Sequence, residues 1–186
     1  MTQTCYNTDD LHDASNIASS TTSNQVIGAY VTSSSVALYD QTIDKCSLYL
    51  ARPSTMSGGS FALGVWDSSG DNKVQSATFS TSAMAVGGVD DVEKLTKDID
   101  TVTIEIGDTL GIITLSAPTG SGELKVGMTI NSAPADWKRA IFIQGSSPAG
   151  GLTENRALGC CVTTSSGPSP SSSGTLLPPP IATVRL

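Results

Sequence analysis

Short runs of alternating apolar and polar residues are the feature that most constrains what this chain can fold into. In Ser60–Trp66, the residues Phe61, Leu63 and Val65 fall on one face of an extended segment. Similar runs recur through residues 25–163, and Gly, Asp, Ser or Pro interrupts them every ~8–12 residues. Because side chains of a strand point alternately to opposite faces, this pattern predicts an all-β, antiparallel β-sandwich with one wet face per strand.

The pattern also predicts where the strands lie. We expect Gln25–Val31, Val36–Tyr39, Thr42–Ala51, Ser60–Trp66, Lys73–Phe79, Asp100–Ile106, Thr109–Leu115, Glu123–Ile130, Ala140–Gln144 and Ala157–Thr163. In the third of these, Cys46, Leu48 and Leu50 share one face and are expected to point into the core. Only Val89–Lys97 looks helical, and we expect a short helix or loop inserted between strands there.

Composition divides the chain into three parts. Residues 1–24 are polar and lack periodicity, so they are expected to form an N-terminal arm, followed by the sandwich at residues 25–164. Residues 165–186 begin with a Ser/Pro/Gly-rich stretch that cannot form a core and is typical of a linker. Three prolines then precede a β-prone end in which Ile181, Val184 and Leu186 recur. We expect this end to be an assembly arm that adds a strand to an adjacent subunit.

The charge distribution argues against two classes of partner. The chain has a net charge of −7, and no cluster of Lys or Arg occurs anywhere in its 186 residues. We therefore expect neither nucleic-acid binding nor attraction to anionic membranes. No apolar stretch approaches the ~20 residues of a membrane span. Of the 186 residues, 49 are Ser or Thr, which suits the exposed positions of strands.

The first residues, Met1–Cys5, lack the basic and apolar regions of a secretory signal. We expect either that a signal was removed and Met1 added, or that the protein is made in a cytosol and is never exported by that route, which is how a virion protein is made.

Four cysteines are present: Cys5, Cys46, Cys160 and Cys161. They form no CxxC pair, so a structural zinc site is not expected. The position of Cys46 among inward-facing residues indicates a buried core thiol. The adjacent Cys160 and Cys161 must point to opposite faces of a strand. A disulfide from Cys5 to either of them would pin the N-terminal arm, and the sequence leaves the choice open.

Three motifs carry a family resemblance: TIDKCSLYL at Thr42–Leu50, the run from Met56 to Gly70 that ends in GVWDSSG, and IGDTLGI at Ile106–Ile112. They resemble the "tidkvsfyl", "Gsxxvgvwdssg" and "gdxlgi" segments of jelly-roll β-sandwich domains. Those domains are similar to carbohydrate-binding modules and recur in extracellular archaeal and bacterial proteins and in viral structural proteins. The resemblance covers roughly residues 25–163 and implies a jelly-roll fold. It implies little about function, because jelly rolls serve as capsid proteins, lectins and decorations alike. The chain departs from the family pattern at Thr81–Lys97 and in its two arms.

The chain is not expected to be an enzyme. Its four glutamates, Glu93, Glu105, Glu123 and Glu154, show no spacing that pairs two of them for glycoside hydrolysis. The single histidine, His12, lies in the polar arm, and no G-x-S-x-G elbow is present. No catalytic residue is therefore assigned.

Calcium is the one cofactor that remains open. Oxygen ligands gather at Asp67, Asp71 and Asn72, and again at Asp90, Asp91 and Glu93. The resemblance supports such a site, because related modules often carry a structural calcium. The first group does not match an EF-hand loop, and turn chemistry explains it better. We expect no metal site here.

Two aromatic residues define a candidate contact face. Trp66 alternates out of phase with the core residues of its strand, and Tyr49 does so in its own strand. If the two strands are neighbours, the two rings share an outer face. Such a face could bind a sugar or a neighbouring subunit, since aromatic residues are enriched at protein contacts. We favour the subunit contact.

These observations lead to two expectations of function. The first is a non-enzymatic structural protein of a virion, a capsid, decoration or other shell component. It would assemble as a homo-oligomer with other shell proteins through its sandwich and arms. The alternative is an extracellular or cell-surface module that binds carbohydrate, acts in adhesion or forms a surface fibre, with glycans as partners.

Overall fold

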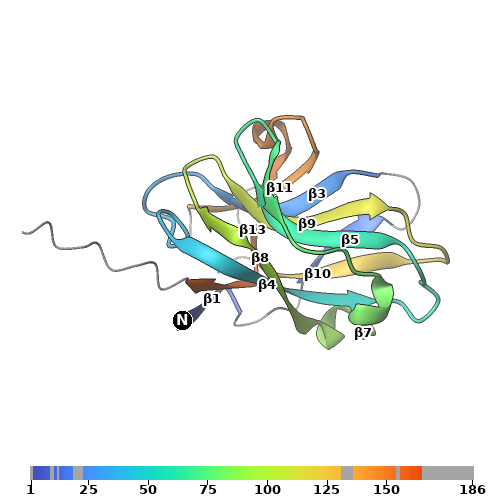
Figure 1. The fold of residues 1–186 in the computed structure, drawn as a ribbon. Helices are drawn as coiled ribbons and strands as arrows, with labels where there is room; N and C mark the ends of the chain where they lie inside the picture. Colours follow the sequence, from blue (N-terminus) through green and yellow to red (C-terminus); the bar gives the residue numbers. More distant parts are fainter. Residues whose placement is uncertain are drawn as a thin grey trace, which may run out of the picture.

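The computed structural model describes residues 2–8, 11, 13–18, 23–130, 136–153 and 156–164. In these residues the chain forms two antiparallel β-sheets that lie face to face, with three short 3₁₀ turns (Figure 1). The all-β antiparallel sandwich that the sequence predicts is thereby confirmed, in an arrangement compatible with a jelly roll. No helix in these ranges is long and apolar enough to cross a membrane.

The larger sheet has eight strands within the described ranges, in the order β1-β14-β4-β10-β13. Strand β2 pairs with β10, and both β7 and β8 pair with β4. The members are β1 (Thr2–Tyr6), β2 (Asp13–Ala18), β4 (Thr42–Arg52), β7 (Ala85–Val86), β8 (Glu93–Thr103), β10 (Glu123–Ile130), β13 (Arg156–Leu158) and β14 (Cys160–Thr164). The first strand of the chain therefore lies beside the last described one.

The smaller sheet has six strands in the same ranges, in the order β12-β11-β3-β9-β5-β6. These are β3 (Gln25–Val31), β5 (Ser60–Trp66), β6 (Asn72–Gln75), β9 (Thr109–Ser116), β11 (Trp137–Ile143) and β12 (Leu152–Thr153). The 3₁₀ turns η1 (Thr81–Ala83), η2 (Val89–Asp91) and η3 (Pro148–Gly151) lie in the connections. Strands β3, β5 and β10 match the expected ranges residue for residue.

The main core lies between the two sheets and is built by the alternation seen in the sequence. Cys46, Leu48 and Leu50 of β4 face Phe61 and Leu63 of β5 in a cluster whose members are almost completely buried. Full burial of each such side chain contributes about 1.5–3 kcal/mol to folding. The alternation therefore fixes both the register and the face that each strand turns inward.

A row of three glycines crosses the smaller sheet, where Gly28 pairs with Gly111 and Gly111 pairs with Gly64. A Cβ atom on Gly111 would lie 2.7 Å from the Cα of Gly28 and would also clash with the carbonyl oxygen of Ile27. The absence of side chains in this row lets the three strands approach and twist closely.

Several expected elements differ in the structure. The strand expected over Lys73–Phe79 ends at Gln75, and the one expected over Ala157–Thr163 is divided between β13 and β14. Residues 36–39 form turns rather than a strand, although Val36 is buried. The segment Val89–Lys97 is not helical but contains η2 and the start of β8. Its apolar residues are spaced as in a helix, but β8 alternates inward-facing and exposed positions as an edge strand does. The strand expected over Asp100–Ile106 begins earlier and ends at Thr103, because the following residues turn back into β9.

Two described segments of the expected N-terminal arm pair with the larger sheet. Strand β1 pairs with β14, and β2 pairs with β10 along six residues. In these two segments the chain before residue 25 is therefore part of the sheet. These strands were not expected from the sequence because neither shows the apolar alternation of the core strands. Residues 165–186, and with them Ile181, Val184 and Leu186, lie outside the described residues.

Candidate functional site

A disulfide joins Cys5 of β1 to Cys161 of β14, 156 positions apart in the chain. The two residues are direct register partners, and their Cα atoms lie 4.0 Å apart. Of the two partners that the sequence left open for Cys5, the structure uses Cys161. Cys160 points to the opposite face and is fully buried in the core. The alternation of one strand therefore decides which of two adjacent cysteines is available.

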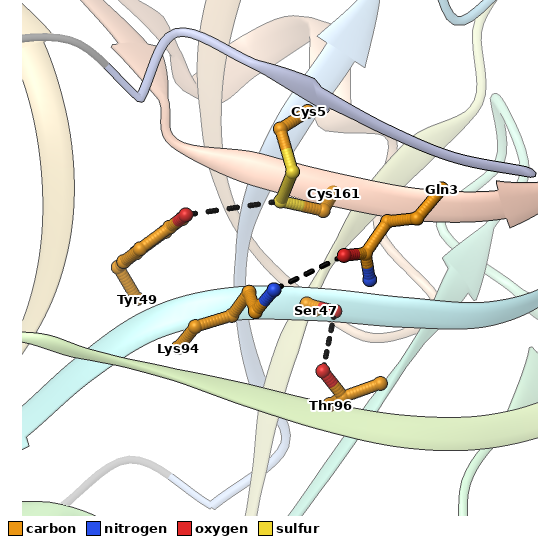
Figure 2. The surroundings of a disulfide bond; sticks show 7 residues. All are labelled: Gln3, Cys5, Ser47, Tyr49, Lys94, Thr96 and Cys161. Atoms are coloured by element: carbon orange, nitrogen blue, oxygen red, sulfur yellow. Dashed lines mark hydrogen bonds between the residues drawn. A yellow bond between two sulfur atoms is a disulfide. The ribbon is translucent and has the colours of Figure 1, made fainter.

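The disulfide lies on the outer face of the larger sheet, among side chains from four strands (Figure 2). The Tyr49 hydroxyl lies 3.8 Å from the Cys161 sulfur, and it must be the donor because a disulfide sulfur carries no hydrogen. Lys94 Nζ donates to Gln3 Oε1 at 3.1 Å, which ties β1 to β8 across the sheet. A second cross-strand contact joins the hydroxyl groups of Ser47 and Thr96 at 2.8 Å.

Leu11, in the segment after β1, packs on the same face beside two glycines, Gly159 and Gly127. A Cβ atom on Gly159 would collide with the side chain of Leu11, and one on Gly127 would lie 3.6 Å from it. The same position on Gly127 would be 3.1 Å from the Tyr49 Cβ. Leu11 therefore occupies space beside Gly159 that is free only because residue 159 has no side chain. Asn7 adds a polar contact, because its carbonyl accepts from Thr129 Oγ1 at 3.1 Å.

The two free cysteines of the described residues, Cys46 and Cys160, are buried on neighbouring strands of the core. Burial raises the pKa of each thiol to about 12, and Cys160 adds to the effect on Cys46. Burial and Cys160 also raise the pKa of Tyr6, whose ring lies 5.5 Å from that of Trp137. Thiols in this state are not nucleophiles at neutral pH. Cys46 is the buried core thiol that the sequence predicts.

Trp66 and Tyr49 do not share an outer face, contrary to expectation. Trp66 belongs to the smaller sheet and Tyr49 to the larger one, so they lie on opposite sides of the sandwich. Trp66 does point away from the main core, but it is fully buried in a second apolar cluster with Phe142 and Ile113. Leu152 packs against this cluster, just after η3. A covering segment cannot be foreseen from strand alternation alone.

The acidic residues considered as calcium ligands form hydrogen bonds within their own turns. Asp67 Oδ1 accepts from the backbone N–H groups of Ser69 at 2.8 Å and Asp71 at 3.0 Å, which is turn chemistry. Asp90, Asp91 and Glu93 line an open depression of about 370 Å³, and Asp91 accepts from the Gly88 N–H. Within the described ranges, no group of three or more His, Cys, Asp or Glu side chains is placed to hold a metal ion.

A buried ion pair was not expected from the sequence. Lys73 Nζ of β6 lies 2.8 Å from Asp108 Oδ2 and 2.7 Å from Glu105 Oε2. Burial raises the pKa of Asp108, even though hydrogen bonds from Lys73 and from the Glu105 N–H oppose the shift. For Lys73, burial lowers the pKa, but the bonds to the two carboxylates outweigh it and the pKa is raised. In the sequence, the Gly107-Asp108 pair before β9 indicates a turn, but nothing there indicates that Lys73 is the partner of Asp108.

Two of the residues weighed for catalysis, His12 and Glu154, lie outside the described residues. Glu105 binds Lys73, and Glu123 lies 3.3 Å from Lys125, in ion pairs at the surface. Comparison of the chain with protein-family models, with curated proteins and with solved structures found no match.

Proposed function

We propose that this chain is a structural protein of a virion, a capsid, decoration or other shell component that assembles without catalysing a reaction. The observation that carries the proposal is the Cys5–Cys161 disulfide, which joins the first strand to the last described strand. Structural disulfides persist on secreted proteins and on the surfaces of virions and cells, and they are rare in reducing cytosols. A sandwich whose first strand is covalently bonded to β14 suits a subunit that must keep its shape in a shell.

The sandwich supports the same proposal through its two separate apolar clusters. One fills the space between the sheets, and the second lies on the outer side of the smaller sheet around Trp66. Residues 165–186 then follow directly after β14, from the same sheet that carries the disulfide. A folded block with a terminal extension is an arrangement through which subunits can hold their neighbours.

The structure removes the main support for the glycan-binding alternative. It relied on Trp66 and Tyr49 forming one exposed platform, but the Trp66 side chain is fully buried. Tyr49 is half-buried and hydrogen-bonds to the disulfide. The face around Tyr49 therefore offers no pair of exposed aromatic rings for stacking on a sugar.

The test is the native mass of the full chain, purified without reductant and measured by native mass spectrometry and electron microscopy. We expect large symmetric assemblies. A protein that stays monomeric up to millimolar concentration, and that is not incorporated into particles, contradicts the proposal. Deletion of residues 165–186 examines the arm separately: assemblies of unchanged stability would show that the arm plays no part. A glycan array checks the alternative, for which we expect no signal.

A further inference from the structure

Strand β1 lies at one end of the larger sheet. Among the described residues it pairs only with β14, and Thr2 through Cys5 are exposed. An edge strand presents a row of backbone N–H and C=O groups to which another strand can bind. Because β1 is fastened by the disulfide, this edge stays in place.

The register shows which groups face outward. Cys5 and Cys161 are directly opposite, and their Cα separation of 4.0 Å is that of a non-hydrogen-bonded pair, since hydrogen-bonded pairs lie about 5.5 Å apart. The pattern alternates, so Gln3 and Thr163 form a second pair of this kind. The backbone N–H and C=O groups of Gln3 and Cys5 therefore point away from β14, toward the free side of β1.

A second edge strand of this sheet, β8, which pairs with β4, differs in chemistry. It contains five charged residues, and Lys97 lies over the ring of Phe79 at 4.9 Å, facing the core side. Charges on an edge strand, especially inward-pointing ones, prevent pairing with other strands. The sequence of β1, Thr-Gln-Thr-Cys-Tyr, carries no charge at all. Of these two edge strands, β1 is therefore the one open to a further strand.

The remaining chain begins beside this edge. Thr164, the last residue of β14, pairs with Thr2, and its hydroxyl donates to the Thr2 carbonyl at 3.3 Å. Sixteen residues, 165–180, separate it from the alternating sequence Ile-Ala-Thr-Val-Arg-Leu at 181–186. Fully extended, such a spacer spans at most about 55 Å, enough to reach a neighbouring subunit. The three prolines at its end favour an extended conformation over the tight reversal that pairing with its own β1 requires.

We propose that residues 181–186 of one copy bind as an added strand to the free edge of β1 in a second copy, through the backbone groups of Gln3 and Cys5. This rests on the proposed function and names the surface through which the subunits join. Because tail and edge are different surfaces, the contact is head-to-tail and generates rings or filaments.

Two full-length variants each remove one half of the contact. Gln3→Pro removes an N–H that faces the free side of β1 while leaving the hydrogen bonds to β14 intact. Gln3→Ala is its matched control, because it removes the same side chain and its bond to Lys94 but keeps the N–H. Val184→Pro disables the tail. We expect the wild type and Gln3→Ala to assemble, and each proline variant to be monomeric by sedimentation, with the disulfide intact.

Mixing the two proline variants decides whether the contact forms between copies. One supplies a working tail and the other a working edge, so we expect a one-to-one complex of twice the monomer mass. A mixture that stays monomeric, as pairing within one chain would produce, overturns the proposal. Assembly of Gln3→Pro equal to that of wild type also overturns it, while leaving the proposed structural function standing.

A second measurement tests binding of the tail to β1 directly and does not require large assemblies to form. A synthetic peptide of residues 175–186 is added to full-length Val184→Pro, and amide hydrogen exchange is followed at Gln3 and Cys5. We expect at least about ten-fold slower exchange at these two amides when the peptide is saturating. Protection of these amides, together with a wild type that never forms particles, would support this edge and contradict the virion role. Unchanged exchange at saturating peptide would overturn the edge.

Discussion

Removing the disulfide is the sharpest test of how the N-terminal segment is held. The double variant Cys5→Ser/Cys161→Ser leaves no new exposed thiol and replaces each sulfur with a smaller polar atom. In the oxidised protein the bond closes a loop whose ends are 156 positions apart. In the chain-entropy description, closing a loop of that length destabilises the unfolded state by about 5 kcal/mol at 25 °C. This is an upper figure, because denatured chains are more compact than the description assumes.

The corresponding change in melting temperature is large. For a domain of 150–250 residues, 1 kcal/mol shifts Tm by about 2–4 °C, so a loss of 5 kcal/mol lowers Tm by roughly 10–20 °C. Differential scanning calorimetry of the oxidised wild type and the double variant measures the shift. The wild type in reductant should melt near the variant, and reductant should not change the variant.

A Tm difference below about 2 °C between the oxidised wild type and the double variant would refute the reasoning, because the bond would then contribute almost nothing to the free energy of unfolding. Cys160→Ala serves as the control for the choice of cysteine. It leaves the disulfide intact and should lose only the few kcal/mol of a small core cavity. Loss of the disulfide in Cys160→Ala, detected by mass spectrometry, would mean that Cys5 pairs with the other cysteine.

Three further outcomes follow from the core. Lys73→Met leaves Asp108 buried without its cation, so urea denaturation at pH 7 should show a loss of about 2–3 kcal/mol. Because a raised pKa means that the folded state binds a proton more readily, this deficit should shrink as the pH falls toward 4, and a constant deficit would contradict the assignment. Gly111→Ala should lower the free energy of unfolding by about 1–3 kcal/mol through the clash with the neighbouring strand, whereas Gly150→Ala, where the new methyl meets nothing within 4 Å, should not. With thiol pKa values of about 12, the two free cysteines should resist a thiol-labelling reagent at pH 8 in the native protein and react once it is unfolded; fast native labelling would place them at the surface.

The sequence predicted the sandwich because alternation is a local property. Phe61, Leu63 and Val65 repeat with a period of two, and that period alone assigns them to the core side of β5. For Trp66 the alternation correctly predicts a side chain that points away from the main core, but it does not predict that this side chain is buried. The residues that cover it lie about 80 positions later in the chain. Alternation says which way a side chain points and nothing about what covers it.

The candidate site was also predicted only in part from the sequence. Adjacent cysteines on one strand must face opposite ways, so the sequence reduced the choice for Cys5 to one partner on each face. It could not decide between them, because the register of β1 against β14 depends on contacts far apart in the chain. The pairing of Lys73 with Asp108 was missed for the same reason, since these residues belong to different strands and connections.

The position of the disulfide also has a mechanical consequence. Cys5 and Cys161 lie near the two ends of the described chain, so nearly all of the sandwich is contained in a single covalent ring. A pull applied between the residues before Cys5 and those after Cys161 passes through the sulfur–sulfur bond. The strands between them carry almost none of that tension. A subunit drawn on by its neighbours from both ends would therefore resist extension as a covalent link does, and its sheets would unfold under such a load only after the bond had been reduced.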